Sequence, residues 1–66
     1  MNQVYRFEHA GYVLQQTDYN WHYVIFEKES GKVIMEAQCT VKLDEESAKK
    51  HIAFCLKKIE KIKRKN

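Results

Sequence analysis

The sequence has little of several residue types that define common classes of protein. Its two glycines, Gly11 and Gly31, exclude a glycine-rich phosphate-binding loop. Its two cysteines, Cys39 and Cys55, are too few for a disulfide framework, which favours a reducing compartment. No apolar run is long enough to span a bilayer, and residues 1–6 lack the apolar segment of a secretory signal. The composition therefore predicts a cytoplasmic protein that does not enter the membrane.

The length of the chain argues against an enzyme. A domain of 66 residues buries only about 60% of the surface that its unfolded chain exposes, which is too little to enclose a deep pocket. No serine lies in a nucleophile-elbow pattern, and the adjacent acids Glu45 and Glu46 are better explained as residues of a helix start. We therefore expect residues 1–66 to form a single domain that has no catalytic residues and needs no cofactor.

The last third of the chain has the clearest periodic pattern and predicts one helix over residues 44–64. Asp44 is a suitable N-cap, and Glu45 and Glu46 lie in the first turn, near the positive end of the helix dipole. Spacings of three and four residues indicate a helix packed along one stripe. The stripe consists of Ala48, Ile52, Cys55, Leu56, Ile59 and Ile62.

The residues before this helix predict an antiparallel sheet. Strands are expected over residues 12–17, 21–28 and 33–41, and residues 1–9 are either an edge strand or an arm that crosses the sheet. Aromatic and β-branched residues are densest in the second of these strands. The predicted fold is α+β: a three- to four-stranded meander with one C-terminal helix packed on one face (β-β-β-α).

The register of the last two strands depends on the turn that joins them. A three-residue loop with Gly31 in the left-handed conformation pairs Lys28 with Lys32. One face then carries the pairs Ile25–Met35, Tyr23–Ala37 and Trp21–Cys39, together with Val33 and Val41. A two-residue turn at Ser30-Gly31 would shift the register by one residue. We prefer the first register because it groups more apolar residues on the face that the helix covers.

In this register three apolar residues, Val24, Phe26 and Ile34, form a small cluster on the opposite face of the sheet. If residues 1–9 form an arm, Tyr5 or Phe7 would cover the cluster. If they do not, the cluster is available to a partner.

Charge is divided unevenly along the chain. Residues 1–48 contain four basic and eight acidic side chains, whereas residues 49–66 contain eight basic side chains and one acidic one. Phe54 lies opposite Ile52 on the helix and is expected to face solvent among lysines. This outer surface of the predicted helix carries Lys50, Phe54, Lys57, Lys58, Lys61 and Lys65.

A metal site is the weakest of the candidate sites. His51 and Cys55 are four residues apart, a helical spacing that places two ligands on one side. Together with Cys39 and either His9 or His22 they could form a tetrahedral zinc site. The chain has no C-x-x-C pair, and buried cysteines are common in protein cores, so we expect no metal. A disulfide between the two cysteines is left open.

In outline, three antiparallel strands followed by a helix resemble the arm-type DNA-binding domains of some tyrosine recombinases. The likeness rests on the strand at Trp21–Tyr23, the Gly31 hairpin and the helix entry at Asp44–Lys50. It implies DNA recognition by the face of the sheet, which requires basic residues. The strands here are acidic instead, with Glu8, Asp18, Glu27, Glu29 and Glu36.

The last three elements also resemble the end of a double-stranded-RNA-binding domain, whose first helix this chain lacks. That family carries phosphate-binding lysines at the start of its final helix. Residues 44–46 are acidic here, and the lysines Lys49 and Lys50 follow them.

These observations predict a small non-enzymatic protein that acts by binding another protein or a second copy of itself. Such a chain would suit a bacterial or phage-encoded regulator or inhibitor. The surfaces expected to bind the partner are the outer lysines and Phe54 of the helix and the cluster on the opposite face of the sheet. The alternative is a nucleic-acid-binding protein that uses the lysine-rich helix, because residues 49–66 are strongly basic.

Overall fold

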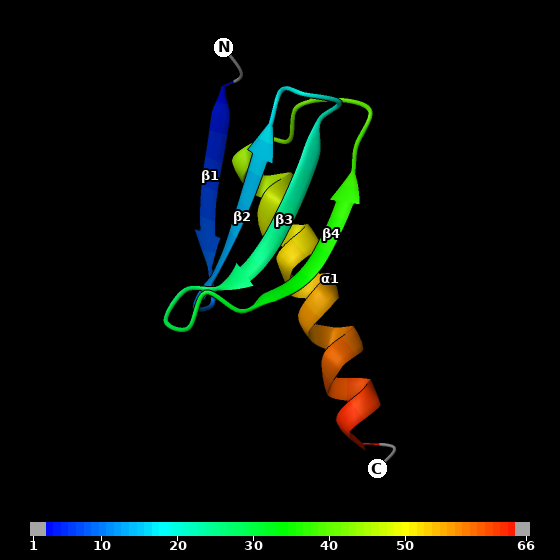
Figure 1. Ribbon diagram of the computed structural model, residues 1–66. Coiled ribbons are helices and arrows are strands. Elements are labelled where there is room, and N and C mark those ends of the chain that lie inside the picture. The colour runs from blue at the N-terminus through cyan, green and yellow to red at the C-terminus, as the bar shows by residue number, and fades with distance from the viewer. Residues whose placement is uncertain (1–2, 65–66) are drawn as a thin grey trace.

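The computed structural model describes the backbone of residues 3–64 and the side chains of residues 3–61. Its elements are β1 (Val4–His9), β2 (Tyr12–Thr17), β3 (His22–Glu27), β4 (Val33–Gln38) and α1 (Glu45–Arg64). The strands form one antiparallel sheet in chain order, and α1 crosses one of its faces (Figure 1). The α+β meander with a C-terminal helix is confirmed, and β1 is an edge strand rather than an arm. The predicted positions of Ile62 and Lys65 lie outside the described side chains.

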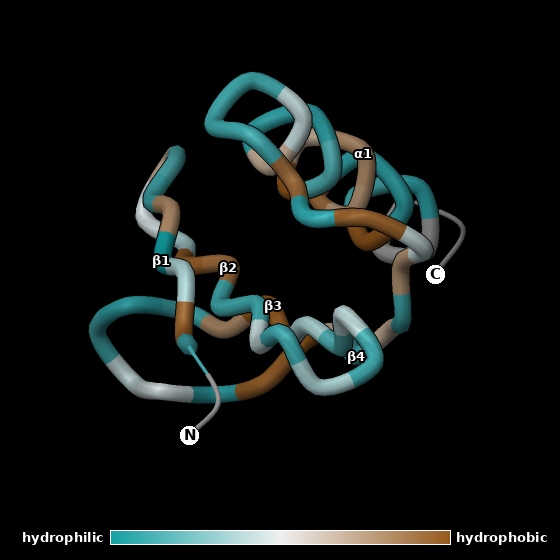
Figure 2. The backbone as a smooth tube through the Cα atoms, turned by 90° about the horizontal axis from the view of Figure 1, so that it is seen from above, coloured by the Kyte–Doolittle hydropathy of each residue, from teal (hydrophilic) through white to brown (hydrophobic). Residues whose placement is uncertain are grey.

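The hydrophobic core lies between α1 and the sheet. Leu14 of β2, Ile25 of β3 and Ile52 of α1 are fully buried. Figure 2, which looks along the layers, shows the helix on one side of a curved sheet. The predicted helix stripe is confirmed for the described side chains, because Ala48, Ile52 and Cys55 are buried and Leu56 and Ile59 pack against them. The other core residues are Tyr23 and Leu43, with Phe7, Tyr12, Ile34, Met35, Ala37 and Cys39 packed around them.

The β3–β4 hairpin closes with a four-residue loop rather than the predicted three. The Glu27 N–H donates to the carbonyl of Lys32, and the Gly31 N–H donates to the carbonyl of Glu27, both at 2.8 Å. Gly31 is left-handed, with φ of 75°, as predicted. The pairing of Lys28 with Lys32 is therefore wrong. A β-bulge at Ile34 absorbs the extra loop residue and restores the predicted pairs farther along the strands, Ile25–Met35 and Tyr23–Ala37.

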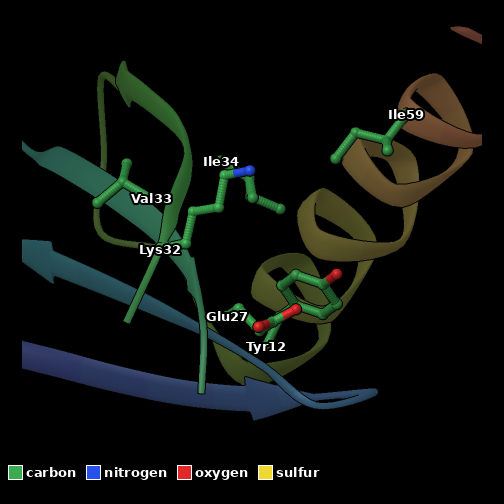
Figure 3. A pocket seen from close by; sticks show the side chains of 6 residues that line it. All are labelled: Tyr12, Glu27, Lys32, Val33, Ile34 and Ile59. Carbon is green, nitrogen blue, oxygen red and sulfur yellow. The ribbon is translucent and has the colours of Figure 1, made fainter. Parts of the chain in front are cut away.

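The bulge also exchanges the faces of two neighbouring residues. Val33 pairs with Phe26 and points away from the helix, whereas Ile34 points toward the helix and packs against the core (Figure 3). The predicted cluster is therefore wrong in one member, because a shift of one residue moves a side chain to the opposite face. On this open face of the sheet, Phe26 pairs with the fully buried Val13, and Val24 is half-buried.

Trp21 lies in the β2–β3 turn rather than in a strand. Asn20 and Trp21 have φ of 55° and 52°, and the His22 N–H donates to the carbonyl of Tyr19 at 3.3 Å, which defines a type I′ turn. The expected pairing with Cys39 exists as a hydrogen bond from the Cys39 N–H to the Trp21 carbonyl. The half-buried residues that pack against the core do not include Trp21, so its predicted place under the helix is wrong.

A buried glutamine fixes the connection between β4 and α1. Gln16 is fully buried, and its Nε2 donates to the carbonyls of Trp21 at 3.2 Å and Val41 at 3.1 Å. Its Oε1 accepts from the Leu43 N–H at 2.8 Å, which places Leu43 in the core. β4 ends at Gln38, and Gln16 binds backbone groups of the segment that leads from β4 to α1. Val41, predicted in the strand and under the helix, is outside the strand and 60% exposed.

The β1–β2 turn provides a first testable prediction. It is a two-residue turn in which Ala10 and Gly11 have φ of 52° and 83°. An alanine in the left-handed region is strained by about 1 kcal/mol, whereas Asn-Gly is the preferred pair for a type I′ turn. We expect Ala10→Asn to raise the melting temperature by about 4 °C in thermal unfolding followed by circular dichroism. Gly11→Ala should lower it, and equal effects of the two variants would contradict this description of the turn.

The start of α1 provides a second prediction, on pH. The Asp44 side chain accepts from the Ser47 N–H at 2.7 Å, which confirms the N-cap and lowers the pKa of this carboxyl below its ordinary value. A carboxyl whose pKa is lower in the folded state stabilises the fold above its unfolded-state pKa and loses that contribution as pH falls through the folded-state value. The melting temperature should therefore decrease when the pH is lowered below about 4. Asp44→Asn keeps a cap that does not ionise, so its melting temperature should fall less. An identical acid-induced fall in both proteins would argue against the cap.

Candidate binding surface on the outer face of α1

The outer face of α1, which points away from the sheet, contains the most exposed aromatic side chain of the helix. Phe54 is 59% exposed, as the helical periodicity predicted from its position opposite Ile52. The lysines predicted around it are also exposed along α1. Taken in chain order, the outer face consists of Ser47, Lys50, Phe54, Lys57, Lys58 and Lys61. The structure therefore keeps Phe54 and the predicted lysines of α1 together on one surface.

An open hollow of about 360 Å³ lies in the first half of this surface, lined by Ser47, Lys50, His51 and Phe54. His51 connects the hollow to the core: its Nδ1 lies 3.5 Å from the hydroxyl of Tyr23, and the two ring centroids are 5.5 Å apart. Phe54 forms one wall of the hollow. The hollow therefore combines a hydroxyl, an ammonium group and an imidazole with an apolar ring. Sequence reasoning missed this role of His51, which depends on contact with a residue 28 positions earlier in the chain.

The electrostatic environment of the surface is basic. The Nζ of Lys58 lies 4.9 Å from the centroid of the Phe54 ring, a cation–π contact that places an ammonium group over the ring. Lys50 faces Glu46 one turn earlier at 3.7 Å, but both side chains are more than three-quarters exposed. An exposed i,i+4 ion pair contributes little, so Lys50 can turn to a partner at small energetic cost. The arrangement suits an anionic group placed beside an apolar one.

The second predicted surface, around Phe26 and Val24, lies on the opposite side of the molecule. The helix covers one face of the sheet, and these residues belong to the other face (Figure 2). At its edge, Lys28 bonds Glu8 at 2.7 Å, which lowers the pKa of that carboxyl. The structure therefore does not join the two predicted surfaces into one site, and Ile34 belongs to neither.

Ile34 instead lines a groove that the sequence did not indicate. The groove, of about 410 Å³, opens between the β3–β4 hairpin and the C-terminal half of α1 (Figure 3). Its position follows from the bulge, which turns Ile34 toward Ile59, and from the helix extending beyond the sheet. The lining consists of Tyr12, Glu27, Lys32, Val33, Ile34 and Ile59.

The two cysteines are free thiols in the core region. Cys55 is buried and Cys39 is half-buried, and burial raises the pKa of the Cys39 thiol, which makes it a poorer nucleophile. Burial is also the main cause of the raised pKa of Tyr23, with smaller effects from both thiols. Among the described residues, no group of three His, Cys, Asp or Glu side chains could hold a metal ion.

Comparisons of the chain with protein-family models, with curated proteins and with solved structures give no match. Within the described part of the chain, no helix combines the length and the apolar content needed to cross a membrane. The residues of the outer face of α1 and their geometry are therefore the basis for a proposed function.

Proposed function

We propose that this chain is a small non-enzymatic cytoplasmic protein that binds an acidic surface of another protein through the outer face of α1. Phe54 is the anchor of that interface, and the surrounding lysines orient the partner. Such a protein would act as a bacterial or phage-encoded regulator or inhibitor. The observation that carries the proposal is the exposure of the Phe54 ring on a regular helix, with the Lys58 ammonium group over it.

Phe54 has no structural task that would explain a phenylalanine at this position. It lies on the side of α1 opposite the buried Ile52 and does not belong to the core. An exposed phenylalanine keeps apolar surface in contact with water, whereas burial of that surface would be favourable. Aromatic residues at the centre of an interface contribute much of the binding energy when a partner excludes water from them.

The charge of this surface decides what kind of partner it fits. If two copies paired symmetrically through the outer face, Lys50, Lys57, Lys58 and Lys61 of one copy would face the same lysines of the other. Like charges placed together in an interface cost several kcal/mol, on the order of the whole binding energy of a weak dimer. An acidic partner instead neutralises them and is attracted from a distance.

The proposal predicts that Phe54→Ala separates binding from folding. Because the ring is exposed, the variant should change the free energy of unfolding by less than about 0.5 kcal/mol. It should weaken partner binding at least about tenfold, as expected for an interface anchor. The measurement is affinity purification from native lysate after nuclease treatment, followed by titration of the recovered partner.

Tyr19→Ala is the matched control. Tyr19 is 66% exposed and lies in the β2–β3 turn, so this variant removes a comparable ring that is not part of the outer face of α1. Partner binding should survive Tyr19→Ala and be lost in Phe54→Ala. Equal recovery of the partner by both variants would refute the proposed interface.

Binding of nucleic acid is a second candidate function, favoured by one observation. Lys57, Lys58 and Lys61 are exposed on the C-terminal half of α1, where a DNA or RNA strand could approach. The end of this helix extends beyond the sheet (Figure 1). This function predicts binding of short DNA or RNA at low salt whose affinity falls steeply as salt rises. Partner recovery that disappears after nuclease treatment, together with a gel shift at micromolar protein, would favour it over a protein partner.

A further inference from the structure

We propose that the hollow lined by Ser47, Lys50, His51 and Phe54 is a carboxylate subsite, so that the partner presents an acidic peptide segment with an apolar side chain beside an Asp or Glu. This inference rests on the proposed function and deepens it, because it names the chemistry that the outer face of α1 recognises. The hollow measures about 360 Å³ and is open to solvent, which suits side chains of a partner rather than an enclosed small molecule.

Two polar groups of the hollow, on Lys50 and His51, can act as donors toward a carboxylate. Ser47 is not one of them, because both its backbone N–H and its hydroxyl hydrogen-bond the N-cap Asp44. His51 directs Nδ1 toward the hydroxyl of Tyr23, which leaves Nε2, on the other side of the ring, for a ligand. Lys50 supplies the ammonium group. Hydrogen bonds to a charged acceptor are stronger than neutral ones, so these groups together favour an anion.

The apolar wall of the hollow would bind the partner's apolar side chain. Phe54 borders the hollow directly and keeps more than half of its surface exposed. A side chain such as leucine, placed next to the bound carboxylate, would remove the ring from water. This burial provides the non-directional part of the affinity, and the carboxylate fixes the position of the peptide.

A carboxylate fits the local charges better than the phosphates of a nucleic acid. Three acids, Asp44, Glu45 and Glu46, lie at the start of α1, directly beside the hollow. A nucleic-acid strand carries a charge at each nucleotide and would continue over these acids, where repulsion opposes it. A single acidic side chain needs only the hollow, so the acids restrict the surface to short acidic segments.

The test is an NMR titration of the full ¹⁵N-labelled chain with two blocked peptides. The probe is acetyl-Gly-Asp-Leu-Gly-amide, which carries one carboxylate, and its neutral match is acetyl-Gly-Asn-Leu-Gly-amide. We expect the acidic peptide to bind at least about tenfold more tightly, which corresponds to about 1.4 kcal/mol. The shifts should centre on the amides of residues 47–54 and on the ring of His51. Inorganic phosphate, titrated separately, should leave these resonances unchanged.

Matched variants keep the test independent of folding. Lys50→Gln should weaken binding of the acidic peptide at least about threefold, because one of the charge-assisted bonds is lost. Lys49→Gln should leave it unchanged, because Lys49 faces another side of the helix, where it pairs with Glu45 at 3.4 Å. Dispersed amide spectra identify folded variants. Equal affinity for the two peptides, or phosphate shifts equal to those of the peptide, would overturn the subsite. In those cases loss of the natural partner in Phe54→Ala would still uphold the proposed function.

Discussion

Gln16→Leu should destabilise the fold by about 3 kcal/mol or more. The substitution removes three hydrogen bonds at once and leaves the carbonyls of Trp21 and Val41 and the N–H of Leu43 without their side-chain partner. Leaving a buried polar group unpaired costs about 1–3 kcal/mol. A chain of this length has a total stability of only several kcal/mol, so we expect the variant to be largely unfolded near body temperature.

The measurement is urea unfolding followed by tryptophan fluorescence, since Trp21 is the only tryptophan and accepts a hydrogen bond from Gln16. Gln15→Leu is the matched control, because it makes the same chemical change at the preceding residue, whose side chain points to the open face of the sheet. Gln15→Leu should change the unfolding free energy by less than about 1 kcal/mol. Equal stability of the two variants would mean that Gln16 does not hold the connection to α1.

Ile52→Ala should destabilise the fold by about 3 kcal/mol, the second large effect. Ile52 is fully buried where α1 crosses the sheet, so its truncation leaves a cavity beside Leu14 and Ile25 of the same core cluster. Alanine is the better helix former, so the expected loss reports packing rather than helix propensity. Urea unfolding of the purified variant measures this loss of unfolding free energy directly.

Phe54→Ala is the internal comparison for this prediction. It removes a larger side chain only two residues away, yet from the exposed side of the helix. We expect the larger truncation, Phe54→Ala, to destabilise the protein less than Ile52→Ala. If Phe54→Ala cost more stability than Ile52→Ala, the orientation of α1 on the sheet would be wrong.

The sequence predicts the helix and most of the sheet because their signals are local and repeated. The three- and four-residue spacing of Ala48, Ile52 and Cys55 fixes which side of α1 is buried, and the N-cap at Asp44 fixes where it begins. The pairing of Ile25 with Met35 was also predicted, although for an incomplete reason. A four-residue loop and a bulge shift the strand register in opposite directions. Together they give the same residue pairs as a three-residue loop without a bulge, so the hydrophobic pattern of the sequence cannot distinguish the two.

The misplaced residues are those whose environment depends on distant parts of the chain. Gln16 follows a polar residue at the end of a strand and gives no sign that it is buried, because its partners are backbone groups as many as 27 residues away. Tryptophan is a residue type that is common in strands, but Trp21 lies in a turn that requires a left-handed backbone at this position. Ile34 changes face because of the bulge.

For the candidate site, sequence periodicity identified Phe54 and the lysines of α1 as outward-facing. It could not identify the hollow, because that depends on the contact between His51 of α1 and Tyr23 of β3. Surface residues on a regular helix can therefore be predicted from the sequence, whereas the chemistry of a concave site requires the packing of the helix on the sheet.

Site-specific photo-crosslinking in living cells measures whether the outer face of α1 contacts another protein. Phe54 is replaced by p-benzoylphenylalanine in one protein and Tyr19 in another, so that the same reactive ring stands on the outer face of α1 or in the β2–β3 turn. We predict one discrete protein adduct of higher mass from position 54 after irradiation, and none from position 19. An adduct from the turn with none from the helix, or no adduct from either, would contradict the assignment of the outer face of α1 as the binding surface.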